Sequence, residues 1–189
     1  MVVQKIFKKC QCLSSNEILI HNLLKITKLD TGTITMNKRK ETIRVLIQEI
    51  VSGLETRAEQ EQKTITLNGS DAAVLYGDGV WLKEGIGNLV KNALDHTEAG
   101  GKIEITWQET PAITRIMVQD NGQGIHPEDI HHIFKRFYRS RFSQDTQGLG
   151  LGLSLAKSIV KAHNGTLTVD SSLGKGSIFR LDFLKITKL

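Results

Sequence analysis

Three glycines stand at the start of a predicted helix, where they could open backbone N–H groups to an anion. Gly148, Gly150 and Gly152 alternate with leucine in the run QGLGLGLSLA, residues 147–156. The first turn of a helix leaves N–H groups unpaired at the positive end of its dipole, and glycine lets a phosphate approach them. A flexible linker is the alternative, but linkers favour serine and polar spacers over leucine. The run therefore favours a packed loop that binds phosphate.

Two asparagines on another predicted helix could supply oxygen ligands to a cation. Asn88 and Asn92 are four residues apart, so they share a face of a helix that is otherwise apolar at Leu89, Val90 and Ala93. Mg²⁺ accepts neutral carboxamide oxygens when phosphates provide the charge. A solvated helix surface is the alternative for a single asparagine, whereas two on one face favour a ligand.

The segment DNGQGI, residues 120–125, places a carboxylate beside two glycines at the end of a predicted strand. An Asn-Gly hairpin turn is the alternative. The following HPEDIHHIF has a helical pattern and does not resemble a returning strand. We therefore expect Asp120 to accept a hydrogen bond from a ligand amino group.

The segment FKRFYR, residues 134–139, combines aromatic and basic side chains. Phe134 and Phe137 could anchor the segment while Arg136 and Arg139 turn toward a phosphate. A basic surface turn is the alternative. The sequence has neither a Walker motif nor a G-x-G-x-x-G motif after a strand, so the two commonest nucleotide-binding folds are not supported.

The apolar pattern predicts an α+β two-layer sandwich, in which three long helices cover one face of a mixed sheet and a further helix precedes them. That first helix, about Ser15–Leu29, should pack on another helix or another chain. The loop from Asp120 to Gly150 is long enough to be functional, with a short helical stretch near Pro127–Phe134. The long helices are expected at Glu41–Gln60, from Asp78 as N-cap to His96, and from the glycines to Asn164, and the strands at Thr33–Asn37, Thr64–Leu67, Ala72–Leu75, Lys102–Gln108, Ile113–Gln119, Thr166–Asp170 and Ser177–Leu184.

The composition describes an ordinary globular chain. Its 189 residues suffice for one core, and the net charge of +5 comes from scattered side chains, which gives little support to nucleic-acid binding. No apolar run approaches the ~18 residues of a membrane helix, and the N-terminus lacks a signal-peptide core. The two cysteines, Cys10 and Cys12, are too few for a disulfide framework, so we expect reduced thiols in the cytoplasm.

The four motifs together resemble those of a known family. In order, NLVKNALDHT, DNGQGI, FKRFYR and GLGLGL closely resemble the N box, first glycine box, F box and second glycine box of sensor histidine kinases. Their ATP-binding domain has the Bergerat fold, which gyrase-type ATPases share. The segment LLKITKLDTG, residues 23–32, resembles the end of the second dimerisation helix. The resemblance implies that residues 1–32 end a dimerisation-type helix and that residues 33–189 form the ATP-binding catalytic domain.

The resemblance also implies roles for individual residues. Asn92, assisted by Asn88, would bind Mg²⁺, and Asp120 would receive the adenine amino group. Arg139, alone or with Arg136, would meet the γ-phosphate, and residues 123–148 would form the ATP lid. The implied catalytic residues are Asn88 and Arg139, and the implied nucleotide-binding residues are Asn88, Asn92, His96, Asp120, Gly122, Gly124, Ile125, Arg136, Tyr138, Arg139, Gly148, Leu149, Gly150, Leu151 and Gly152.

Three positions depart from the family pattern. Many members have a lysine three positions after the second asparagine, followed by an aromatic residue, whereas this chain has Asp95 and His96. An acid cannot bind phosphate, so Arg139 would have to carry more of that load. Leu149 stands where threonine or serine is common.

The expected activity is transfer of the γ-phosphate of Mg-ATP to a histidine outside this chain, in bacterial two-component signalling. None of the six histidines has the H-box context His-Glu-x-x-x-Pro, and His21 is interpreted as a helix-surface residue. The implied partners are the dimerisation and phosphoacceptor helices of a membrane-anchored parent kinase, a response regulator and a second copy through the N-terminal helix, without nucleic acid or membrane contact by this segment. The alternatives are a non-catalytic nucleotide-binding regulatory module and an anti-sigma-type serine kinase.

Overall fold

Alternating apolar residues build a five-stranded mixed sheet. The computed structural model describes residues 17–140 and 149–185, and in them β2 pairs in parallel with β4 while the other neighbours are antiparallel. The inward side chains, such as Ile105, Val118 and Phe179, are fully buried, whereas the opposite face carries mostly polar side chains. Across the sheet the order is β2 (Thr64–Gly69), β4 (Lys102–Glu109), β5 (Ile113–Asp120), β7 (Ser177–Leu184) and β6 (Gly165–Ser171).

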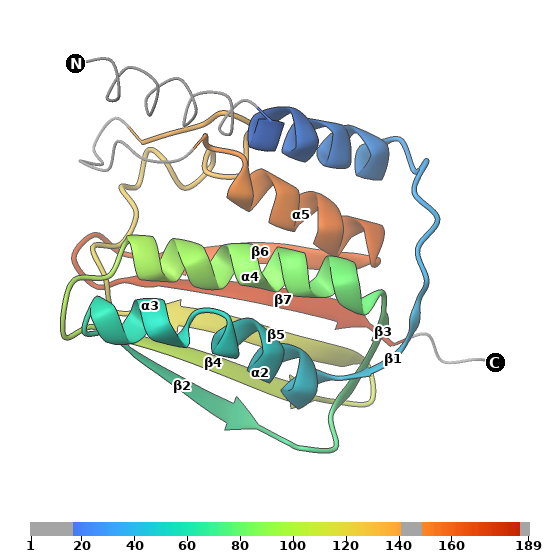
Figure 1. The fold of residues 1–189 in the computed structure, drawn as a ribbon, viewed down its shortest axis with the longest axis horizontal. Helices are drawn as coiled ribbons and strands as arrows, with labels where there is room; N and C mark the ends of the chain where they lie inside the picture. The colour runs from blue at the N-terminus through green and yellow to red at the C-terminus, as the bar shows by residue number, and fades with distance from the viewer. Residues whose placement is uncertain (1–16, 141–148, 186–189) are drawn as a thin grey trace, which may run out of the picture.

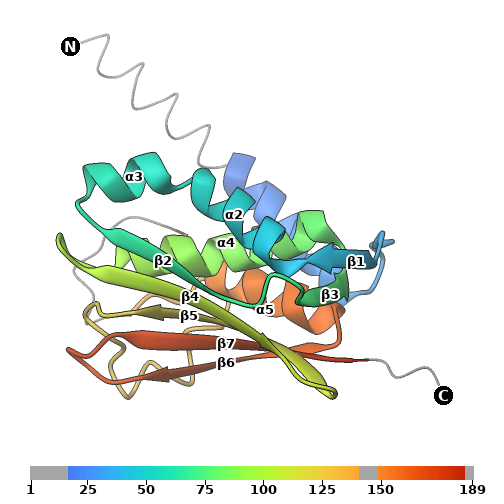
Figure 2. The same cartoon turned by 90° about the horizontal axis from the view of Figure 1, so that it is seen from below.

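Helices cover one face of this sheet, as expected for the α+β sandwich (Figures 1 and 2). They are α2 (Ile43–Ser52), α3 (Glu55–Gln60), α4 (Gly79–Asp95) and α5 (Gly152–Ala162). The predicted N-cap of α4 is confirmed, because Asp78 Oδ1 accepts hydrogen bonds from the N–H groups of Val80 and Trp81. The single helix expected over residues 41–60 is wrong, because the chain breaks between α2 and α3 at Gly53 and Leu54.

The helix at residues 17–30 packs on another helix, as its apolar spacing predicts. Ile26 and Leu29 are buried against Leu155 and Ile159 of α5. Figure 1 shows this helix beside α5. An ion pair from Lys25 to Glu84 of α4, 2.6 Å long, adds a polar contact.

Two local predictions differ from the structure. Residues 33–38 form no strand; Ile34 and Met36 instead pack against the apolar contact between the N-terminal helix and α5. The strand lies later, at β1 (Arg39–Thr42), and pairs with β3 (Val74–Gly77) in a separate two-stranded sheet. Residues 127–134 form consecutive turns, such as that closed by the bond from His132 N–H to Asp129 O, where a short helix was expected.

The helices α4 and α5 approach each other closely. A Cβ added to Gly85 of α4 would lie only 3.1 Å from Cγ2 of Ile159 on α5. Glycine inside a helix costs about 1 kcal/mol relative to alanine. Gly85 therefore exchanges helix stability for a short distance between the two helices that position the site below.

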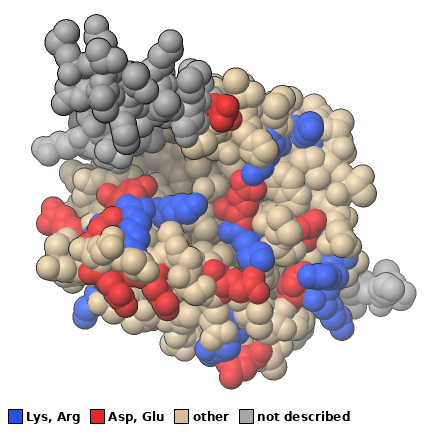
Figure 3. Space-filling model, in the orientation of Figure 1, with Lys and Arg blue, Asp and Glu red and all other residues tan. Residues whose placement is uncertain are grey.

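The face of the molecule shown in Figure 3 is hollowed, and charged side chains of both signs surround the hollow. This mixture agrees with the scattered charges of the sequence. In the part of the chain that the structure describes, no helix combines the length and apolar character needed to cross a membrane.

A buried histidine joins the end of α5 to the start of α4. His163 is 6% exposed; its Nδ1 donates to Ile159 O at 2.8 Å, and its Nε2 accepts from the Asp78 N–H at 3.0 Å. Burial lowers the pKa of His163, and the nearby Lys38 ammonium acts in the same direction. The neutral ring is therefore the form that the fold requires.

This lowered pKa predicts a loss of stability in mild acid. The unfolded chain binds a proton at His163 more readily than the folded chain, so His163 destabilises the fold as pH falls through the unfolded pKa. Between about pH 7.5 and about pH 5.5 the free energy of unfolding should fall more steeply in the native chain than in a His163→Gln variant. The extra slope is limited to about 1.4 kcal/mol per pH unit for one proton. Denaturant titrations at several pH values measure this slope. An equal pH dependence of the free energy of unfolding in the two proteins would contradict a lowered pKa at His163.

Candidate functional site

A cavity of about 440 Å³ lies between α4, the start of α5, the long loop and the β6–β7 hairpin. Its volume is in the range typical of small-molecule sites. Most of the residues predicted to bind a nucleotide line it: Asn88, Asn92, His96, Gly124, Ile125, Tyr138, Arg139, Leu149, Gly150, Leu151 and Gly152. Motifs that are far apart in the sequence are therefore brought together by the fold.

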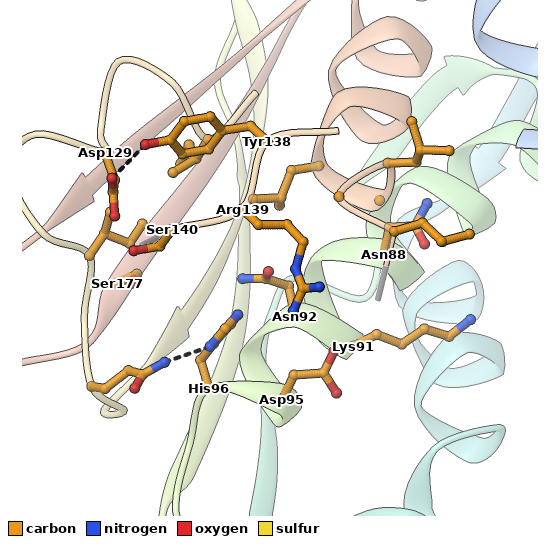
Figure 4. A pocket seen from close by; sticks show the side chains of 18 of the residues that line it. Asn88, Lys91, Asn92, Asp95, His96, Asp129, Tyr138, Arg139, Ser140 and Ser177 are labelled. Carbon is orange, nitrogen blue, oxygen red and sulfur yellow. Dashed lines mark hydrogen bonds between the residues drawn. The ribbon is translucent and has the colours of Figure 1, made fainter. Parts of the chain in front are cut away.

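One face of α4 forms a wall of the cavity. Asn88, Lys91, Asn92 and Asp95 follow one another along this face, and Figure 4 shows their side chains. Asn88 and Asn92 are half-buried, and within residues 17–140 and 149–185 their side-chain amides make no hydrogen bond. Two adjacent carboxamides without protein partners are suited to bind an external group.

Asp95 is paired with a cation from a neighbouring helix. Arg57 of α3 donates from Nη2 to Asp95 Oδ1 at 2.6 Å, and from Nε to Glu61 at 2.7 Å. The negative charge of Asp95 is therefore balanced by an arginine that does not line the cavity.

The two described glycines of the GLGLGL run serve different purposes. Gly150 has φ of +66°, and a Cβ there would lie 2.6 Å from Tyr138 O. Phe137 N–H also donates to Gly150 O at 3.0 Å, so this glycine lets the loop pack on itself. A Cβ at Gly152 would meet nothing closer than Asn88 Oδ1, at 3.8 Å, so this glycine faces the cavity. The third, Gly148, lies outside the described residues.

Asp120 is buried next to the strand residue Ser177, which lines the cavity. Asp120 is 4% exposed, and its Oδ1 accepts a hydrogen bond from the Gly122 N–H at 2.9 Å. Burial raises the pKa of Asp120, while the N–H groups of Gly122 and Ser177 partly offset this effect. Asp120 does not itself line the cavity, but Ser177, its partner across the β5–β7 ladder, does.

The glycines after Asp120 are required by close backbone contacts. A Cβ at Gly122 would lie 2.0 Å from His96 O, and one at Gly124, where φ is +70°, would lie 2.1 Å from Ser172 O. Between them, the Gln123 side-chain amide donates to His96 Nδ1 at 2.7 Å, the bond that the dashed line at His96 marks in Figure 4. Gly122 does not line the cavity, whereas Gly124 and His96 do.

The two arginines of the FKRFYR segment point to different places. Arg139 lines the cavity, and its guanidinium lies near Asn92 in Figure 4. Arg136 is not among the lining residues; it forms an ion pair with Asp30 at the end of the N-terminal helix. Asp30 also accepts a hydrogen bond of 2.8 Å from Ser158 of α5.

Several lining residues were not predicted. Ile18 and Asn22 come from the N-terminal helix, and Leu173 and Ser177 from the β6–β7 hairpin. Tertiary packing brings these four to the cavity, so no local motif could reveal them. Lys91 does lie within the asparagine motif, and its position between Asn88 and Asp95 on one helix face was a usable signal.

The comparisons with known proteins agree with this geometry. Residues 77–188 match the family model described as "Histidine kinase-, DNA gyrase B-, and HSP90-like ATPase". The chain belongs to this family. Membership implies that it binds ATP.

Similar proteins within the family are sensor kinases. The chain is 36% identical over 166 residues to the sensor histidine kinase RppB of Synechocystis, covering 86% of this chain and 37% of that protein. It is 34% identical to the sensor protein kinase PmrB of Pseudomonas aeruginosa, covering 84% and 33%. The Acinetobacter baumannii histidine kinase AdeS has the same fold, with a TM-score of 0.81 at 21% identity over 96% of this chain and 84% of that one.

These similarities favour a histidine kinase catalytic domain over the anti-sigma-type kinase and the non-catalytic regulatory module. The chain spans about a third of the length of the curated relatives it matches.

The two glycines predict opposite mutational effects. Gly152→Ala should leave the fold as stable as the native chain or slightly more stable, because alanine favours helix. It should weaken ATP binding about tenfold, because the methyl group would enter the space between α5 and Asn88 and remove a contact of about 1.4 kcal/mol. Gly150→Ala should lower the free energy of unfolding by more than about 1 kcal/mol, because of its positive φ and the Tyr138 carbonyl. Calorimetry and denaturant titration measure both effects. Unchanged ATP affinity in a folded Gly152→Ala variant would contradict the prediction that ATP lies against Gly152.

Proposed function

We propose that this chain is the catalytic part of a sensor histidine kinase, which transfers the γ-phosphate of Mg-ATP to a histidine outside the chain. One observation carries the proposal: the asparagine pair of α4, the start of α5 and Arg139 meet around one cavity in a member of this ATPase family. None of the histidines of the sequence lies in an H-box context, so the acceptor belongs elsewhere.

The proposed pose places adenine at the end of the cavity formed by His96, Gly124 and Ser177, in front of Asp120. The phosphates extend toward Asn88 and the open face at Gly152. Arg139 meets the γ-phosphate and stabilises its charge during transfer. Arg136 has a smaller part, because its guanidinium is engaged by Asp30.

Mg²⁺ fits the donors that the cavity offers. Asn92 and Asn88 present neutral oxygens, and within the described ranges no cluster of three or more His, Cys, Asp or Glu side chains could hold a metal ion. Such a donor set suits a cation that arrives with nucleotide phosphates and keeps several waters. We propose that Asn92 binds this ion, assisted by Asn88. The ion would offset the charge of the phosphate oxygens.

In the proposed reaction a nitrogen of the acceptor imidazole forms a bond to the γ-phosphorus. The bond from that phosphorus to the bridging β–γ oxygen breaks, and ADP leaves with the electron pair. The residues of this chain bind and orient the triphosphate, because positioning and charge stabilisation supply most of the catalysis of phosphoryl transfer.

The proposed partners follow from the N-terminal helix. We assign residues 1–32 to the end of a dimerisation-type helix and residues 33–189 to the catalytic domain. Ile18, Ile20 and Leu24 are 54%, 55% and 52% exposed on this helix, an apolar surface suited to the dimerisation and phosphoacceptor helices of a parent kinase or to a second copy. A response regulator would then receive the phosphate. We propose a cytoplasmic location for this segment within a bacterial, membrane-anchored parent.

Phosphotransfer to a supplied acceptor tests the proposal. The full chain, incubated with Mg²⁺ and labelled ATP, should phosphorylate the dimerisation and phosphoacceptor domain of a related sensor kinase. The product should be acid-labile and base-stable, and the chain itself should stay unlabelled. Asn92→Ala should reduce the rate at least about tenfold through loss of a bound-ion contact.

The matched control is Asn68→Ala, which removes an exposed asparagine of β2 on the polar face of the sheet. It should leave the rate unchanged. No transfer to any of several acceptor domains, from a chain that binds ATP, would contradict the kinase activity. Stoichiometric phosphate on His21 would contradict the external acceptor.

A further inference from the structure

The cavity has an unusual distribution of charge for a triphosphate site. The resemblance to sensor histidine kinases implies a lysine at the position of Asp95, so this site lacks that cation. Among the described residues that line the cavity, the lysine and arginine side chains are Lys91 and Arg139. A nucleoside triphosphate carries several negative charges, so a second cation beside Arg139 would matter for its binding.

Lys91 lies at the end of the cavity where the phosphates are expected. It follows Asn88 by three residues and precedes Asp95 by four, so it shares their row on α4. Figure 4 shows Lys91 on the same side of the cavity as Asn88 and away from His96 and Ser177. The residue is exposed, and its ammonium has no ion pair or hydrogen bond within the described part of the chain.

Arg57 keeps Lys91 available. A lysine and an acid four residues apart on a helix commonly pair with each other. Here the Asp95 carboxylate instead accepts from Arg57 Nη2 at 2.6 Å. This contact compensates the acid from outside the cavity and removes the natural intrahelical partner of the Lys91 ammonium.

We propose that Lys91 binds the terminal phosphates of ATP in place of the lysine that the family commonly has at the position of Asp95. Its flexible four-carbon stem carries a point charge that can reach phosphate oxygens from the neighbouring helical turn. Arg57 acts as a positioning residue, because it holds Asp95 away from Lys91. The inference rests on the proposed function, since it needs a triphosphate in this cavity.

Dissociation constants for ATP and AMP, measured by calorimetry on the full chain, test the role of Lys91. Lys91→Ala should weaken ATP binding roughly three- to tenfold and leave AMP binding nearly unchanged, because only ATP has the terminal phosphates. Lys91→Arg should retain most of the ATP affinity. The matched control, Lys40→Ala, removes an exposed lysine of β1 and should change neither constant.

Unfolding temperatures of the variants show whether they remain folded, which alanine at an exposed helix position should allow. Equal weakening of ATP and AMP, or unchanged ATP affinity in Lys91→Ala, would overturn the role of Lys91 while leaving the proposed function intact. A native chain that binds neither nucleotide would instead contradict the proposed function, and this inference with it.

A double variant tests the part played by Arg57. Arg57→Ala should weaken ATP binding more than AMP binding, because Asp95 is then free to pair with Lys91 and to repel phosphate. Adding Asp95→Ala should restore the ATP affinity and leave the AMP affinity nearly unchanged. Repair of a purely structural defect would instead change the affinity for both nucleotides. ATP affinity that stays low in the double variant would overturn the positioning role.

Discussion

The close approach of α4 and α5 is the constraint on which the site depends. Because residue 85 is glycine, Ile159 Cγ2 can lie 3.1 Å from the position that a Cβ at residue 85 would occupy. The same two helices place Asn88 across from Gly152. A larger residue at position 85 would separate the helices and widen the space between the asparagines and the start of α5. The buried apolar faces of both helices hold this geometry, since Leu89, Val90, Leu155 and Ile159 are almost completely inaccessible to solvent.

Glycines near the cavity illustrate how one sequence signal can have two physical causes. Gly150 and Gly124 adopt positive φ and lie against backbone carbonyls of the protein itself. Gly152, in contrast to Gly150, presents an open surface to the cavity. A similar division applies to charge: Asp95 departs from the family pattern, yet Arg57, distant in sequence, compensates it. Residues that support a binding site are therefore recognised only once their neighbours are known.

The order of most helices and strands could be predicted from the sequence, because periodic apolar residues are a local signal. The convergence of the four motifs on one site could be predicted because their residue types and order are also visible in the sequence. It predicted a strand at residues 33–37 that does not form, because Ile34 and Met36 alternate in order to pack under the N-terminal helix. It could not show that Arg136 pairs with Asp30, or that Ile18 and Ser177 reach the cavity, because those contacts join distant segments. Gly53 and Leu54, which separate α2 from α3, were only a weak signal of a break.

The central claim is that an adenine nucleotide occupies the cavity with its base in front of Asp120, and base selectivity tests it most directly. An ionised carboxylate only accepts hydrogen bonds, which suits the adenine amino group and opposes the guanine carbonyl. A mismatch of this kind costs about 1–3 kcal/mol. Dissociation constants should therefore show ATP bound at least about tenfold more tightly than GTP, with a smaller gap in Asp120→Asn. Equal affinities of the native chain for ATP and GTP would contradict the placement of the base at Asp120.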